Sequence, residues 1–171
     1  MSTSWTVALV GLAWAVHLGD WLLAVLRRRG RVAHRGEWLR EIVVRLAMAA
    51  LVVLALVRPG RVPAPLLATI ALALVWGGTM LAIAGRRRLA GAWGIGVRPH
   101  ADMVTTGIHS LVRHPIYIGT SAVLVGQYIA LANLPSLLLL IGALVVVPLK
   151  IVREGVLLRR SAVDANRLGK T

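Results

Sequence analysis

The chain has 171 residues, of which 58% are hydrophobic and 15% charged, and 20 Lys and Arg against 6 Asp and Glu give a formal net charge of +14. Ordinary globular domains are about 45–50% apolar and about 25% charged, and a chain of this size leaves much of its surface exposed, so this composition excludes a soluble domain and a disordered chain. The absence of Cys excludes a disulfide scaffold, a Cys nucleophile and a Cys-ligated zinc site.

Apolar runs of bilayer length predict an all-α, polytopic membrane bundle. About 20 mostly apolar residues cross a hydrocarbon core of about 30 Å, which predicts five transmembrane helices. We expect these helices at about residues 5–26, 38–57, 65–84, 116–132 and 134–152. In the apolar run 42–57 of the second helix, Arg45 lies one turn in, where its long side chain can snorkel to the interface. No repeat or linker divides the sequence, so we expect one domain over residues 1–171.

The basic residues predict the orientation of this bundle. Eighteen of the 20 follow the first, third and fifth helices, whereas Arg58 and Arg61 follow the second. An alternating five-helix path then obeys the positive-inside rule, with the N-terminus outside and the C-terminus in the cytoplasm. We therefore interpret the basic residues as topology signals and anionic-lipid contacts of a multi-pass protein of the cytoplasmic membrane, with no nucleic-acid partner. The preference for Arg, 18 against 2 Lys, is typical of a high-GC bacterial genome.

In the first helix, His17 and Asp20 lie three residues apart on one face. Ionisable residues inside membrane spans are functional by default, and these two would line a substrate entrance. The alternative is that Asp20 reaches the basic cluster at Arg27–Arg29.

The third helix leads into the longest non-membrane segment, a cytoplasmic loop at residues 85–115. A loop of this length beside a compact bundle is uncommon without a function, so it is a candidate binding segment. Its glycines at 91, 94 and 96 do not form a dinucleotide fingerprint, because no strand precedes them. Asp102 is favoured as a turn residue.

Four glycines within the predicted helices favour close helix packing over ligand binding. They are Gly77, Gly78, Gly119 and Gly126.

The densest polar cluster precedes the fourth helix. Pro115 suits a first helical turn, and helical periodicity then places His114, Tyr117 and Ser121 on one face. The positive end of this helix, flanked by Arg113, favours an anion such as a carboxylate. The alternative is that Arg113 and His114 are interfacial anchors and Tyr117 belongs to an aromatic belt.

The connection at Asn133 is so short that the fourth and fifth helices must form an antiparallel hairpin. His114 lies 20 residues before Leu134 and Glu154 lies 20 residues after it. At about 1.5 Å per residue the two arms are equally long, so His114 and Glu154, with Lys150 one turn away, return to the same depth.

These residues carry a resemblance to a known family. Gly107-Ile108-His109, then Arg113-His114-Pro115-Ile116-Tyr117-Ile118-Gly119, with Gly126 and Asn133 following, resembles the G-x-Y…R-H-P-x-Y-x-G…G…N signature of the isoprenylcysteine carboxyl methyltransferase family and its phospholipid-methyltransferase relatives. The similarity covers residues 85–158. It implies a small helical membrane bundle that binds S-adenosylmethionine from the cytoplasm and meets a lipid-like acceptor from the bilayer.

The resemblance also implies roles for individual residues. The cofactor-binding set is Gly107, His109, His114, Pro115, Tyr117, Gly119 and Glu154, and the catalytic set is Arg113, Lys150 and Glu154. Glu154 and Tyr117 suit the cationic sulfonium, and Arg113 or His114 suits the methionine carboxylate. Lys150 or Arg153 would orient an acceptor carboxylate, and no metal is expected.

The sequence also departs from the family pattern. His109 replaces Tyr, Lys150 replaces Arg, Gly155 stands at the second Glu of R-I-x-x-E-E-x-x-L, and residues 161–171 lack the aromatic tail. The expected function is methyl transfer to a lipid-like or isoprenoid acceptor, with carboxyl methylation favoured. The alternative is a non-catalytic member that acts as a membrane interaction protein, and five helices disfavour a transporter built on inverted repeats.

Overall fold

The computed structural model describes residues 3–26, 35–60, 63–89 and 114–168, and these parts contain five helices and no strand. The helices are α1 (Thr3–Leu26), α2 (Arg35–Val57), α3 (Pro65–Leu89), α5 (Pro115–Leu131) and α6 (Leu134–Leu168). Within them, the side chains of residues 3, 35–38, 40–41, 153–154 and 157–168 lie outside the description. The predicted all-α class is confirmed.

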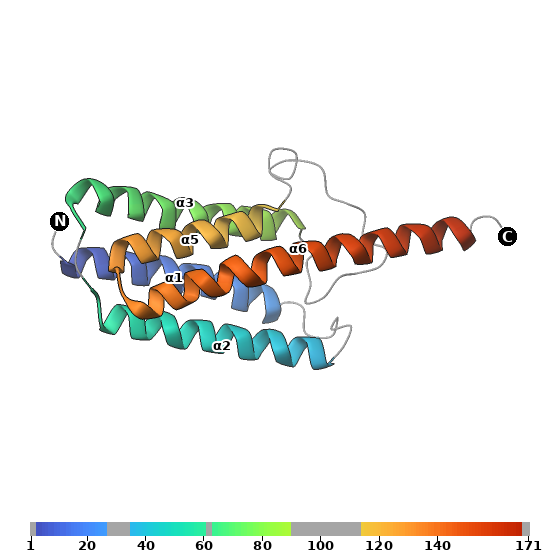
Figure 1. The fold of residues 1–171 in the computed structure, drawn as a ribbon, viewed down its shortest axis with the longest axis horizontal. Helices are drawn as coiled ribbons and strands as arrows, with labels where there is room; N and C mark the ends of the chain where they lie inside the picture. Colours follow the sequence, from blue (N-terminus) through green and yellow to red (C-terminus); the bar gives the residue numbers. More distant parts are fainter. Residues whose placement is uncertain (1–2, 27–34, 61–62, 90–113, 169–171) are drawn as a thin grey trace.

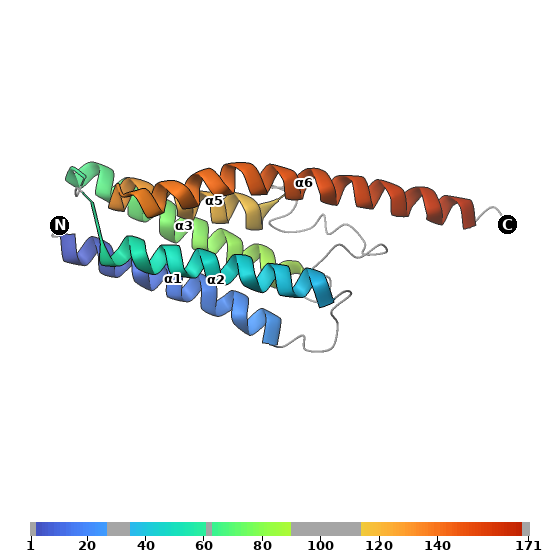
Figure 2. The same cartoon turned by 60° about the horizontal axis from the view of Figure 1, so that its bottom comes forward.

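The helices form an elongated bundle in which α1 and α3 run in one direction and α5 returns beside α3 (Figures 1 and 2). Helix α3 packs against α1 and α5, and α6 packs against α5 and α2. We call the end at which α3 stops and α5 begins the α3–α5 end, and the opposite end, where α5 turns into α6, the hairpin end. The core contains Val10 and Trp14 of α1, Val75 of α3, and Val123 and Leu124 of α5.

Three helical segments are long and apolar enough to cross a bilayer: Ser4–Leu26, Pro65–Leu89 and Leu134–Val152. The apolar helices Ile42–Val57 and Pro115–Leu131 are shorter. The outward faces of α2 and α6 expose large apolar side chains, among them Leu46, Val53, Leu144 and Leu149. Apolar exposure on this scale indicates contact with lipid, and therefore a membrane protein.

Helices α3 and α5 approach each other closely because glycines face each other at their contact. A Cβ atom on Gly78 would lie 2.5 Å from the Gly119 carbonyl oxygen, and one on Gly119 would lie 2.5 Å from the Gly78 oxygen. Gly126 likewise faces the Ala71 oxygen, at 2.6 Å. Small residues allow such backbone proximity in membrane bundles, so the predicted packing role is confirmed at these three glycines. It is wrong at Gly77, where an added Cβ meets nothing within 4 Å.

The short connection between α5 and α6 forms the predicted antiparallel hairpin. Asn133 caps α6, because its Oδ1 accepts a hydrogen bond from the backbone N–H of Ser136 at 3.0 Å. Its Nδ2 donates to the carbonyl oxygens of Ala55 and Arg58, each at 2.8 Å. One side chain therefore joins the hairpin to the end of α2.

Two predicted boundaries were wrong. Helix α3 continues to Leu89, so residues 85–89 form a last helical turn and not the start of the loop. Helix α6 continues to Leu168, 16 residues past the predicted end at 152, and extends beyond the other helices in Figure 1. The reason is the same in both cases: charged residues mark where a helix leaves the apolar layer, but Arg, Leu and Ala remain good helix formers in water.

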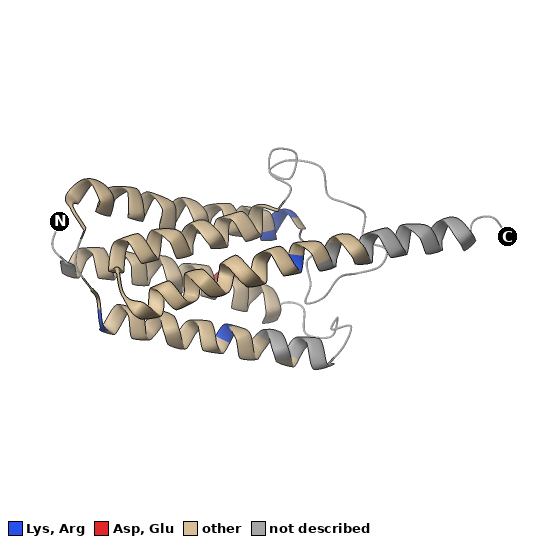
Figure 3. Cartoon of the chain, in the orientation of Figure 1, with Lys and Arg blue, Asp and Glu red and all other residues tan. Residues whose placement is uncertain are grey.

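Arg58 lies at the hairpin end, where its carbonyl oxygen accepts a hydrogen bond from Asn133, and Figure 3 shows most of the described Lys and Arg residues away from that end. Arg86, Arg87 and Arg88 form the last turn of α3, at the α3–α5 end. This asymmetry agrees with the charge pattern used above. The side of the membrane on which each end lies stays a prediction.

Candidate functional site

The first turn of α5 has the features of an anion-binding helix end. His114 is its N-cap residue and Pro115 occupies the first turn, where the missing N–H of proline has no cost. The helical hydrogen bonds begin with Ile118 N–H to the His114 oxygen at 3.0 Å. The side chain of His114 does not cap the helix. The backbone N–H groups of a first helical turn point out of the helix end, and the helix dipole adds positive potential there.

The structure brings three of the predicted residues together at this end. The rings of His114 and Tyr117 lie one turn apart with centroids 6.0 Å from each other and planes tilted by 38°. Both side chains are half-buried, and Pro115 between them is buried. Gly119, one turn deeper, is buried against α3. The geometry thus offers a helix end that the His114 side chain does not cap, beside two aromatic rings, while the cofactor role of each residue stays a prediction.

Helix α6 passes the N-terminal end of α5 and continues beyond it (Figure 1). Lys150 is half-buried, and Glu154 follows one turn later in the same uninterrupted helix. Because α5 and α6 are antiparallel arms of one hairpin, the equal-arm argument for their depth still holds. The side chains of Arg153 and Glu154 lie outside the described residues, and so do Gly107, His109, Arg113 and Asp102 altogether.

The last turn of α3 abuts the first turn of α5. A Cβ atom on Gly85 would lie 3.0 Å from side-chain atoms of both Pro115 and Ile116. The end of α3 and the start of α5, which belong to the candidate binding segment expected at residues 85–115, therefore lie beside each other.

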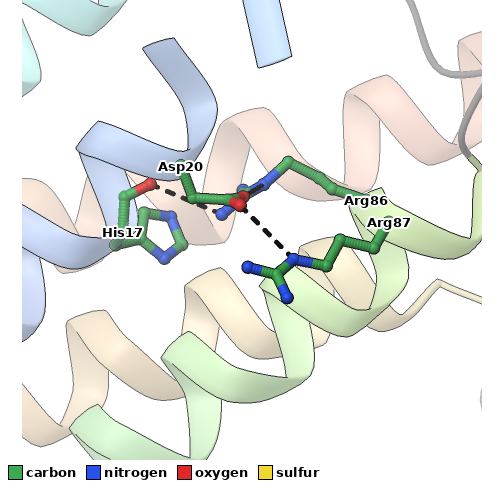
Figure 4. A network of polar contacts seen from close by, with 4 residues as sticks. All are labelled: His17, Asp20, Arg86 and Arg87. Atoms are coloured by element: carbon green, nitrogen blue, oxygen red, sulfur yellow. Dashed lines mark hydrogen bonds and ion pairs between the residues drawn. The ribbon is translucent and has the colours of Figure 1, made fainter. Parts of the chain in front are cut away.

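Beside this contact lies an ion pair that the sequence analysis missed (Figure 4). Arg86 of α3 donates a hydrogen bond from Nε to Oδ2 of Asp20 in α1, at 2.7 Å, and its Nη2 lies 3.4 Å from the His17 carbonyl oxygen. The Arg86 side chain is 2% exposed, and Arg87 approaches the other Asp20 oxygen at 3.9 Å.

The pairing corrects the expected placement of Arg86. The charge pattern places Arg86 in the loop after the third helix, whereas the structure buries it in the last turn of α3, where it pairs with Asp20. The alternative partners predicted for Asp20, Arg27–Arg29, lie outside the described residues. A carboxylate inside a membrane span needs a cationic partner. When helices run side by side, a partner far along the sequence can reach the carboxylate, as Arg86 of α3 reaches Asp20 of α1.

His17 is fully buried, and neither ring nitrogen has a hydrogen-bond partner within the described parts of the chain. Its imidazole packs edge-on against Trp14, with ring centroids 5.5 Å apart. It is enclosed between helices and does not lie at an open surface. Arg45 of α2 places its guanidinium 5.2 Å from the centre of the Trp21 ring of α1, which is a cation–π contact.

A comparison with protein families gives a match to the phospholipid methyltransferase family over residues 66–161. The chain belongs to the phospholipid methyltransferase family. The match covers α3, α5 and most of α6. It agrees with the resemblance to membrane methyltransferases that the motifs carry, and it begins nearer the N-terminus than that resemblance, at residue 66 instead of 85. No curated protein and no solved structure matches the chain.

Family membership identifies the chain as a membrane protein of a methyltransferase family, in agreement with its apolar helices. Arg86, His114, Tyr117 and Lys150 lie within the matched region, whereas α1 with Asp20 precedes it.

Proposed function

We propose that the protein transfers a methyl group from S-adenosylmethionine to a lipid-like or isoprenoid acceptor, with a carboxylate as the favoured nucleophile. The observation that carries this proposal is the N-terminus of α5, which the His114 side chain does not cap, with the rings of His114 and Tyr117 beside it, inside the region that matches a methyltransferase family.

The residues at this end fit the chemical groups of S-adenosylmethionine. Its carboxylate is an anion, for which the N–H groups and the positive dipole end of a helix N-terminus are a suitable site. Its sulfonium is a cation, for which the face of Tyr117 and the carboxylate of Glu154 are suitable neighbours. Arg113, Gly107 and His109 belong to the proposed site through the sequence motif.

S-adenosylmethionine would supply an electrophilic methyl group for an in-line displacement. For such a reaction, the alignment of the two reactants and the exclusion of water matter more than acid–base catalysis. The protein's part is therefore positional: His114 and the α5 N-terminus hold one end of the donor, and Lys150 or Arg153 orients an acceptor carboxylate. A carboxylate is already ionised at neutral pH, so no base is required to activate it.

The acceptor would arrive from the bilayer. The outward faces of α5 and α6 are apolar beside the proposed site, with Ile118, Leu149 and Val152 exposed. A lipid-soluble molecule can therefore keep its chain in the membrane while its polar group reaches the α3–α5 end.

The test is binding and transfer with methyl-labelled S-adenosylmethionine. Purified protein in detergent should bind the cofactor saturably, and membranes that contain it should transfer label to a lipid extract. Label that is released by mild base would indicate a methyl ester, and base-stable label would indicate another acceptor group. Folded protein without saturable binding would contradict the proposal and favour the non-catalytic membrane interaction protein.

A further inference from the structure

We infer that the ion pair between Asp20 and Arg86 is a positioning device for the cofactor end of the bundle. In this role α1, which lies outside the family match, sets the placement of the last turn of α3, and through it the first turn of α5. The inference rests on the proposed function, because it concerns the helix end that would hold S-adenosylmethionine.

The contacts of Arg86 with α1 fix the orientation of its guanidinium group. Arg86 contacts α1 at two points, through Nε on the Asp20 carboxylate at 2.7 Å and through Nη2 on the His17 carbonyl oxygen at 3.4 Å. A planar guanidinium held at two points has a defined orientation, which a single point charge lacks. Figure 4 shows Asp20 between the side chains of Arg86 and Arg87. Arg87 is 78% exposed and 3.9 Å away, so the buried Arg86 is the principal partner.

Neighbouring residues brace the same helical turn from two directions. Arg86 reaches α1, while Gly85 lies against Pro115 and Ile116 of α5. Any movement of the last turn of α3 toward or away from α1 would therefore be transmitted to the start of α5. That start carries His114 and the helix N-terminus proposed to bind the cofactor carboxylate.

Stability alone does not account for the pair. Removing two charged groups from water is costly, and apolar residues of similar size in place of a buried pair are often neutral or stabilising. Elsewhere α1 joins the bundle through apolar contacts of Val10, Ala13 and Trp14. What an ion pair adds to such contacts is a fixed direction, which a cofactor site requires and a membrane anchor does not.

The experiment replaces both partners together. The double variant Asp20→Leu/Arg86→Met leaves no unpaired charge, and the matched control Asn133→Ala removes interhelical hydrogen bonds at the hairpin end. For each protein we would measure the melting temperature in detergent, the Kd for labelled S-adenosylmethionine, and the rate of label transfer into membrane lipid.

We expect the double variant to keep the wild-type melting temperature or exceed it, while its Kd rises by about tenfold, as misplacement of binding groups predicts. We expect the opposite from Asn133→Ala, namely a lower melting temperature with an unchanged Kd. A double variant that binds the cofactor as the wild type does would overturn the inference. It would also be overturned if the double variant lost both melting temperature and affinity, because a general loss of folding would then explain the weaker binding. Folded wild-type protein that does not bind S-adenosylmethionine refutes the proposed function itself, and the inference fails with it.

Discussion

At the scale of single residues, His114 is the side chain on which the proposed cofactor site depends most. His114 is the N-cap residue of α5, but its side chain does not cap the helix, and its ring lies beside that of Tyr117. We predict that His114→Ala raises the Kd for S-adenosylmethionine about tenfold, because a hydrogen bond to a charged group contributes about 1.5–3 kcal/mol. Equilibrium binding of labelled cofactor to purified protein measures this change.

The matched control is Ile118→Ala in the same helix. Ile118 is 51% exposed and faces away from the bundle, so its truncation should leave the Kd unchanged. An unchanged Kd in His114→Ala would remove this residue from the binding site, whereas equal losses in both variants would indicate a general perturbation of α5.

At the scale of helices, the pairing of α3 with α5 depends on adjacent glycines with opposite environments. Gly78 is buried against the backbone of Gly119, whereas an added Cβ on Gly77 meets nothing. We predict that Gly78→Ala destabilises the protein by about 1–3 kcal/mol through overpacking, because the close contact is with backbone atoms that cannot rotate away. Unfolding in mixed detergent micelles provides the measurement.

Gly77→Ala is the companion variant, with the same chemical change one residue away. It should be neutral or stabilise α3 by up to about 1 kcal/mol, since Ala is a better helix former than Gly. Equal effects of the two substitutions would show that the close helix contact does not control stability.

At the scale of the whole molecule, the orientation in the membrane follows from the distribution of charge. The absence of native Cys makes single-cysteine labelling straightforward. We predict that Pro59→Cys, at the hairpin end, reacts with a membrane-impermeant maleimide in intact cells. Arg88→Cys, at the α3–α5 end, should react only after permeabilisation, because the positive-inside rule places the arginine-rich end in the cytoplasm.

The reverse labelling pattern would place the proposed cofactor end outside the cell, where S-adenosylmethionine is not supplied by metabolism. That result would contradict both the orientation and the proposed function. Reaction of both positions in intact cells would show that the membrane is leaky or that the chain does not adopt a single orientation.

The sequence alone determined the five helices, the hairpin at Asn133, the resemblance to membrane methyltransferases, and the gathering of His114, Pro115 and Tyr117 at one helix start. These features are local, because hydropathy over about 20 residues, helical periodicity and a proline in a first turn act within a single segment. The predicted roles at Gly107, His109, Arg113 and Glu154 depend on the motif and remain predictions.

Only the tertiary structure decided which segments are partners. It paired Asp20 with Arg86 across 66 residues, set Gly78 against Gly119, and continued α3 and α6 beyond the apolar layer. Hydropathy predicts that a helix enters the membrane. Because the hydropathy of all membrane helices is similar, it does not determine which helices pack against each other. That selection comes from close backbone packing and from the need of a buried charge for a partner, both of which exist only once the helices are side by side.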